Sequence, residues 1–209
     1  MENTHELHGS ALFGRWVWTT ALAHAAGALA WALPAAWLLR GPGEEAGPAA
    51  TAVMFGLTMI AALLQGAVLG AAQGLVLRHA LPIRPLRWTG ATAAGVALGW
   101  VAIVASSTAL GAGGRPLATM VLSLSVVGGV FGACVGLSQW TLLREHVDGI
   151  GWVVVNAAGW ALALLVTVAA LGMTGAGGAL ALAVGATAAL VSGAVIGLAT
   201  GALLARIAR

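Results

Sequence analysis

The sequence predicts an all-α integral membrane protein, in which six transmembrane helices form three parallel two-helix hairpin repeats with glycine-zipper packing. Three observations predict this fold class: the composition, a series of long apolar runs, and a helix ending that occurs three times. Of the 209 residues, 60% are hydrophobic and only 7% are charged, and the mean hydropathy is +0.99. About a quarter of the residues in a soluble domain are charged. This composition therefore excludes an ordinary soluble fold.

Each apolar run is long enough to cross a bilayer as a helix, which takes about 20 residues. Helices and closed barrels are the two structures that satisfy every backbone hydrogen bond inside a membrane, and these runs lack the alternation of barrel strands. We therefore expect six membrane-spanning helices, near residues 16–39, 50–77, 88–111, 117–143, 152–172 and 178–205.

The six helices are expected to form one transmembrane domain, residues 16–209, after a short cytoplasmic tail, residues 1–15. The tail does not resemble a cleaved signal peptide, because it is acidic before Arg15 and leads into an apolar run that is too long. The single cysteine, Cys134, lies within the fourth predicted helix. It excludes an intramolecular disulfide bond, and we interpret it as a small packing residue.

The arginines predict how the chain is oriented in the membrane. Arg40 and Arg115 fall on one side of the six-helix arrangement. The other side carries Arg15, Arg78, Arg84, Arg87, Arg144, Arg206 and Arg209. Basic residues concentrate on the cytoplasmic side, so we expect both termini in the cytoplasm and the protein in the cell inner (plasma) membrane. The same arginines explain the pI of about 11.1. The expected partner is thus the lipid bilayer and not a nucleic acid.

Two sequence patterns recur with nearly the same period. The even-numbered helices end in GAVLGAAQGLVLR (66–78), GACVGLSQWTLLR (132–144) and GAVIGLATGALLAR (193–206). The odd-numbered helices contain HAAG (24–27), TAAG (92–95) and NAAG (156–159). A period shared by two independent markers predicts three repeats, about residues 16–78, 88–144 and 152–206. Because each repeat has two spans, all three should enter from the same side, around a pseudo-threefold axis along the membrane normal.

Glycines occur at every fourth position near the ends of the even-numbered helices. Positions i and i+4 share one helix face, so each of these helices is expected to present a smooth face. In lipid, small residues let helix backbones approach closely, and we expect these contacts to hold the hairpins together. The packing glycines are Gly66, Gly70, Gly74, Gly128, Gly132, Gly136, Gly193, Gly197 and Gly201.

Six polar residues share the faces of these motifs and are predicted to point into the bundle, at one level near the cytoplasmic interface. This candidate polar belt consists of His24, Gln73, Thr92, Gln139, Asn156 and Thr200. The favoured interpretation is hydrogen bonding between helices, worth about 0.6 kcal/mol per contact. The alternative is a binding site or constriction lined by amide, hydroxyl and imidazole groups, because polar residues inside a membrane are often functional.

The sequence carries no recognisable catalytic or cofactor-binding pattern. His24 is the only ionisable side chain well inside a predicted span, with no carboxylate partner for a proton relay and no second buried histidine for haem. A nucleophile–base pair, a zinc-ligand spacing and a phosphate-binding glycine loop are all missing. We therefore expect that the protein is not an enzyme, with no catalytic residue, no metal and no cofactor.

The repeated ending G-x-x-x-G-x-x-Q-x-x-x-x-R, fullest in GLSQWTLLR (136–144), resembles one found in uncharacterised multi-span bacterial membrane proteins. The resemblance is confined to this motif, and the copies vary. The first has Gly74 where the second has Trp140, and the third has Thr200 in place of Gln. The resemblance implies a membrane protein and no particular activity. The three-repeat plan is also similar to that of mitochondrial carriers, but their proline–acid–basic signature is absent, so carrier function is not inferred.

Two functions follow from these patterns. A non-catalytic structural or accessory membrane subunit is favoured by the lack of buried charge, the short outer loops and the glycine-dense faces. Such a subunit would have a protein partner or form a homo-oligomer. The alternative is a passive channel or transporter for a small neutral or weakly polar solute through the bundle centre. The two differ in whether the polar belt encloses water or is closed by packing.

Overall fold

The computed structural model describes residues 9–31, 47–110, 116–147, 149–172 and 178–207. Every regular element in this part of the chain is a helix. The helices are α1 (Gly9–Ala28), the short 3-10 helix η1 (Leu29–Trp31), α3 (Pro48–Leu77), α4 (Pro85–Leu110), α5 (Leu117–Leu143), α6 (Gly149–Gly172) and α7 (Gly178–Ile207).

Five of these helices, α3 to α7, are long and apolar enough to cross a membrane, which confirms the prediction of a helical, multi-pass fold at this level. Their bounds lie close to the predicted ones. Helix α5 covers the predicted range 117–143, and α4 and α6 each begin three residues before the predicted start. Helix α4 begins at Pro85, where the fixed backbone angle of proline suits the first turn and its missing N–H costs no hydrogen bond.

The first helix begins earlier than predicted. Helix α1 begins at Gly9, so residues 9–15 of the predicted tail are helical. It is not among the five membrane-length helices, because its 20 residues include polar side chains such as Arg15 and His24 and a pair of threonines. The remainder of the predicted first span, residues 32–39, lies outside the described residues.

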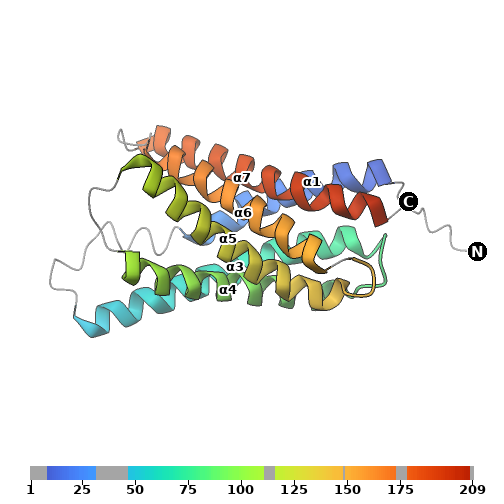
Figure 1. Ribbon diagram of the computed structural model, residues 1–209, viewed down its shortest axis with the longest axis horizontal. Coiled ribbons are helices and arrows are strands. Elements are labelled where there is room, and N and C mark those ends of the chain that lie inside the picture. Colours follow the sequence, from blue (N-terminus) through green and yellow to red (C-terminus); the bar gives the residue numbers. More distant parts are fainter. Residues whose placement is uncertain (1–8, 32–46, 111–115, 148, 173–177, 208–209) are drawn as a thin grey trace, which may run out of the picture.

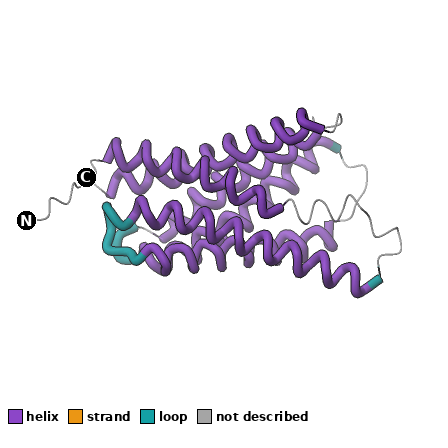
Figure 2. The backbone as a smooth tube through the Cα atoms, turned by 180° about the vertical axis from the view of Figure 1, so that it is seen from behind, coloured by secondary structure: helices purple, strands orange, loops and turns teal. Residues whose placement is uncertain are grey.

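The helices form a closed ring that follows chain order. Helix α1 packs on α3, α3 on α4, α4 on α5, α5 on α6, α6 on α7, and α7 on α1 again. Figure 1 shows them running along the long axis of the bundle. The loops 78–84 and 144–147 lie at the same end as the start of α1 and the end of α7 (Figures 1 and 2). We call this the arginine end, because its exposed side chains include Arg15, Arg78, Arg84, Arg87, Arg144 and Arg206.

The predicted packing glycines lie where two helix backbones are closest. A Cβ atom at Gly66 would be 2.6 Å from the Cα atom of Ala93, and one at Gly132 would be 2.8 Å from the Cα atom of Ala157. Real Cβ atoms essentially never come this close, so these contacts require glycine. Contacts of 3.0 Å or less to the neighbouring helix also occur at Gly70, Gly74, Gly128, Gly136, Gly193, Gly197 and Gly201.

We expected these contacts to join the two helices of each predicted hairpin, and they do not. The glycine faces of α3, α5 and α7 pack on α4, α6 and α1, and so connect one predicted repeat to the next. The two helices within a predicted repeat meet through other residues, for example where Gly95 of α4 approaches Val135 of α5. The reason is geometric: each helix has two neighbours, and the glycine face of α3, α5 or α7 can contact only one of them.

Candidate functional site

Three layers of buried side chains cross the centre of the bundle, four residues apart along each helix. Four residues correspond to a rise of about 6 Å, so each helix supplies one side chain to each layer. The middle one, which we call the polar layer, consists of Thr20, Gln73, Thr92, Gln139, Asn156 and Thr200. None of the six is more than 2% exposed.

Apolar side chains cover the polar layer on both sides. Towards the arginine end lies the tryptophan layer, which consists of Trp16, Leu77, Trp88, Leu143, Trp152 and Leu204. The Trp88 ring contacts the other two tryptophans edge to face, with centroid distances of 6.2 Å to Trp16 and 6.3 Å to Trp152. On the opposite side lies the histidine layer, which consists of His24, Leu69, Val96, Val135, Trp160 and Ile196.

The structure brings together five of the six residues of the predicted belt. The exception is His24, which lies one helical turn further from the arginine end, and Thr20 occupies the expected place on α1. Sequence analysis missed Thr20 because the AAG motif is displaced by one turn in the first helix. A better signal is a tryptophan followed four residues later by a polar residue, as in Trp16–Thr20, Trp88–Thr92 and Trp152–Asn156.

Gln73 is the centre of a hydrogen-bond network in the polar layer. Its Oε1 atom accepts from the indole Nε1 of Trp88 (3.2 Å), and its Nε2 atom donates to Oγ1 of Thr20 (3.2 Å). The amide Nε2 of Gln139 donates to Oγ1 of Thr92 (3.1 Å) and lies 3.4 Å from Oε1 of Gln73. These bonds connect α1, α3, α4 and α5.

Helices α6 and α7 take much less part in this network. The Nδ2 atom of Asn156 donates to the backbone oxygen of Trp152, on its own helix (3.0 Å). Thr200 donates to the backbone oxygen of Ile196 (2.7 Å) and accepts from Nε1 of Trp16 (2.8 Å). The indole N–H of Trp152 has no hydrogen-bonding partner among the described residues. The network is therefore strong on the α3 side of the layer and weak on the α6 side.

Glycines allow the helices that carry the polar layer to approach one another closely. In α3, α5 and α7, the glycine three residues before the polar-layer residue meets a polar-layer residue of the neighbouring helix. A Cβ atom at the glycine would lie 2.8, 3.0 and 3.2 Å from the other Cβ atom in the pairs Gly70–Thr92, Gly136–Asn156 and Gly197–Thr20. Backbone contact thus fixes the level at which the amide and hydroxyl groups meet.

The chemistry available in the three layers is hydrogen bonding. Apart from His24, none of their side chains is ionisable, and the arginines described above are exposed at one end of the bundle. The described residues contain no group of three or more His, Cys, Asp or Glu side chains placed to hold a metal ion. Cys134 is half-buried on α5 and has a free thiol.

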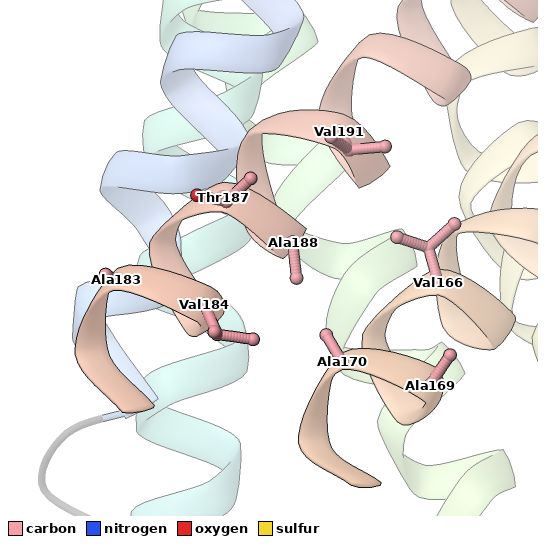
Figure 3. Close-up of a pocket in the computed structure, with 8 residues that line it drawn as sticks. All are labelled: Val166, Ala169, Ala170, Ala183, Val184, Thr187, Ala188 and Val191. Atoms are coloured by element: carbon pink, nitrogen blue, oxygen red, sulfur yellow. The ribbon is translucent and has the colours of Figure 1, made fainter. Parts of the chain in front are cut away.

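Two hollows lie away from the polar layer. One, of about 470 Å³, lies between α6 and α7 at the end opposite the arginines and is lined mainly by small apolar side chains such as Ala170, Ala188 and Val166 (Figure 3). The other, of about 390 Å³, lies between α5 and α6 beside Trp140 and Ile150. No residue of the three layers lines either hollow.

No family matches the chain, and comparison with curated proteins and with solved structures gave no match.

Proposed function

We propose that the chain is a non-catalytic structural or accessory subunit of the bacterial inner membrane, which acts by binding a membrane protein or further copies of itself. A membrane location is supported by the five long apolar helices and by the many large apolar side chains on the outside of the bundle. Leu122 and Leu182, for example, are 65% and 77% exposed. Contact between these side chains and lipid chains has no free-energy cost, whereas their exposure to water would be unfavourable.

The proposed arrangement has six spans, with α1 as the first, in three repeats around a pseudo-threefold axis. Three kinds of contact recur with the predicted period: the glycine faces, the tryptophans of the tryptophan layer, and the polar residues one turn beyond them. The proposed orientation places the arginine end, and with it both termini, in the cytoplasm. Close packing of the glycine faces is what would hold such a bundle together in lipid.

The observation that carries the functional proposal is the closure of the bundle centre. Side chains that line a water-filled pathway expose part of their surface to it. The twelve side chains of the polar and tryptophan layers are at most 2% exposed, and the amide groups that would line a pathway bond to one another instead. This favours the structural role over the passive channel or transporter.

The same closure supports the proposal that the protein is not an enzyme. A catalytic group must reach its substrate, and the polar groups of the layer are covered by tryptophan and leucine on one side and by aliphatic and aromatic side chains on the other. The amide and hydroxyl groups of the polar layer form hydrogen bonds between helices. In membranes such bonds mainly set the register of helices.

Gentle purification from the native membrane, followed by native mass spectrometry, tests the proposed role. We expect a second protein in fixed stoichiometry or a defined homo-oligomer. A monomer that carries a stoichiometric small solute would contradict the proposal and favour a transport function.

Site-directed labelling tests the proposed orientation. In a Cys134→Ala background, a cysteine at the exposed Arg84 should react with an impermeant thiol reagent only from the cytoplasmic side, and one at the exposed Ala49, in the first turn of α3 at the other end of the bundle, only from outside. The reverse pattern, or labelling of each site from both sides, would contradict the orientation.

A further inference from the structure

Three arginines surround the contact between α3 and α4 at the arginine end. A Cβ atom at Gly74 of α3 would lie 3.0 Å from the Cα atom of Pro85, the first residue of α4. Arg78 follows Gly74 by four residues with helical backbone angles, so the two share one face of α3. Arg84 and Arg87 lie one residue before Pro85 and two after it. All three arginine side chains are exposed, and we call them the arginine cluster.

The loop that carries the arginine cluster is anchored in the bundle. Ile83 is buried and packs with the residues of the tryptophan layer, and Leu81 packs against the same residues. The backbone N–H of Leu81 donates to the oxygen of Leu77 (2.8 Å), and that of Arg87 donates to the oxygen of Arg84 (3.0 Å). The backbone positions of the arginines are therefore fixed, and a ligand has to order only their side chains.

The positive charge of the arginine cluster has no acidic residue near it in the sequence. The chain contains no aspartate or glutamate between Glu45 and Glu145, and Glu145 is the only acidic residue in the part of the chain that the structure describes. His79 accepts a hydrogen bond from Nε of Arg78 (3.2 Å), which uses one of the five N–H groups of that guanidinium. The cluster therefore presents three positive charges and many free N–H donors to an anion.

An exposed apolar strip begins at the arginine cluster and follows α4. Leu86, the second residue of α4, is 83% exposed, more than any other large apolar side chain of the described residues. Gly90, Ala94 and Leu98 follow it at intervals of four residues and are also exposed. Positions four apart share a helix face, so the strip runs from the arginines towards the middle of the bundle. A phospholipid has the same order, with a charged phosphate at the interface and an acyl chain below it.

We propose that the arginine cluster binds the headgroup phosphate of an anionic phospholipid, with phosphatidylglycerol as the simplest case, in the cytoplasmic leaflet. Guanidinium groups bind phosphate oxygens through paired N–H groups, and basic sites between membrane helices on the cytoplasmic side bind anionic headgroups. The acyl chain lies along the strip from Leu86 to Leu98. A zwitterionic lipid fits less well, because the three guanidinium groups repel its ammonium group.

This inference rests on the proposed membrane location and orientation and does not depend on the accessory role. The loop between α5 and α6 offers a comparison at the same end of the bundle. Arg144 is exposed there, but as a single arginine with Glu145 beside it. Electrostatic attraction falls off within a Debye length, about 8 Å at physiological salt, so the arginines nearest the phosphate contribute most of the binding.

Native mass spectrometry of the full chain in detergent, with equal amounts of phosphatidylglycerol and phosphatidylcholine of the same acyl chains, tests the site. We expect the protein to retain phosphatidylglycerol in preference to phosphatidylcholine, and the preference to fall as salt is raised. Equal retention of the two lipids would overturn the proposal and leave an acidic protein segment as the candidate partner. Because binding is measured in detergent, neither a reversed orientation nor the lack of a protein partner would change the result.

Substitutions locate the binding. Arg84→Gln and Arg87→Gln should each lower the affinity for phosphatidylglycerol about fivefold, the contribution of one basic residue near an anionic lipid surface. Arg144→Gln removes the same charge from the same end and should change the affinity much less. All three side chains are exposed, so the variants should unfold at the temperature of the parent. A loss with Arg144→Gln as large as that with Arg84→Gln would overturn the site.

A soluble competitor separates a lipid from a free phosphate. Glycerol 3-phosphate carries the phosphate group without acyl chains, so at the same concentration as the lipid it should not displace bound phosphatidylglycerol. Displacement by glycerol 3-phosphate would show that the apolar strip takes no part in binding and would overturn the assignment to a phospholipid.

Discussion

The polar layer has two sides that differ in how they are bonded. On the α3 side, Gln73 and Gln139 reach across to hydroxyl groups of α1 and α4. On the α6 side, Asn156 donates to a backbone oxygen of its own helix, and Thr200 of α7 lies where α3 and α5 have glutamine. Threonine is shorter than glutamine, and the Thr200 hydroxyl donates to a backbone oxygen of its own helix. A repeated sequence pattern thus places residues at one level of the bundle, while the length of each side chain decides which of them bond across helices.

Substitutions of the packing glycines should have the largest effect, and the same effect on both sides of the polar layer, because backbone contact is similarly close at Gly70, Gly136 and Gly197. Gly70→Leu, Gly136→Leu and Gly197→Leu should each destabilise the bundle by about 3 kcal/mol or more, or prevent assembly, since the new side chain enters a backbone contact. Thermal unfolding in detergent measures this loss.

Gly129→Leu is the matched control on α5, because nothing lies within 4 Å of a Cβ atom at that position. This variant should stay folded and match or exceed the parent in stability, since leucine has the higher helix propensity. If the three buried variants unfold at the same temperature as Gly129→Leu, the glycine faces are not packing faces.

A smaller effect should separate the two sides. Gln73→Met keeps the size of the side chain but removes the partner of the Trp88 N–H and the amide that donates to Thr20, so it should cost about 2 kcal/mol. Asn156→Leu removes a bond to its own helix and should cost about 0.6 kcal/mol or less. Reversible unfolding in a denaturing detergent gives both values. Equal losses would mean that the network carries no more stability than the self-bonded side.

The smallest effect is expected for the single hydrogen bond between Gln139 and Thr92. A double-mutant cycle of Gln139→Met with Thr92→Val should show a coupling energy of about 0.6 kcal/mol, typical of hydrogen bonds between membrane helices. The cycle of Thr92→Val with Asn156→Leu should show additivity within about 0.5 kcal/mol, because no hydrogen bond joins that pair. Coupling in the second cycle and none in the first would contradict the bonding pattern described above.

Periodicity predicted much of this architecture. The range of α5 and five of the six polar-layer residues were predicted from the sequence. An amide or hydroxyl group on the glycine-rich face of a membrane helix points into the bundle, because lipid offers it no hydrogen-bonding partner. Periodicity identifies a face of a helix and not its neighbour, so the glycine contacts were expected within repeats and occur between them.

Two further features were beyond the reach of sequence patterns. The first helix has HAAG one turn later than the other repeats would require, so His24 was predicted at the place that Thr20 holds. The asymmetry of the network depends on which amide reaches which hydroxyl, and therefore on the distances between helices. The closure of the centre by three tryptophans likewise cannot be derived without those distances.

Solute flux through the purified protein tests directly whether the centre of the bundle is closed. Proteoliposomes subjected to an osmotic step with glycerol or urea should re-swell at the rate of protein-free liposomes, because the polar and tryptophan layers fill the centre of the ring. Gln73→Met should leave that rate unchanged. Re-swelling that is faster than in protein-free liposomes, and that Gln73→Met alters, would show that the polar layer lines a pathway and would contradict the account.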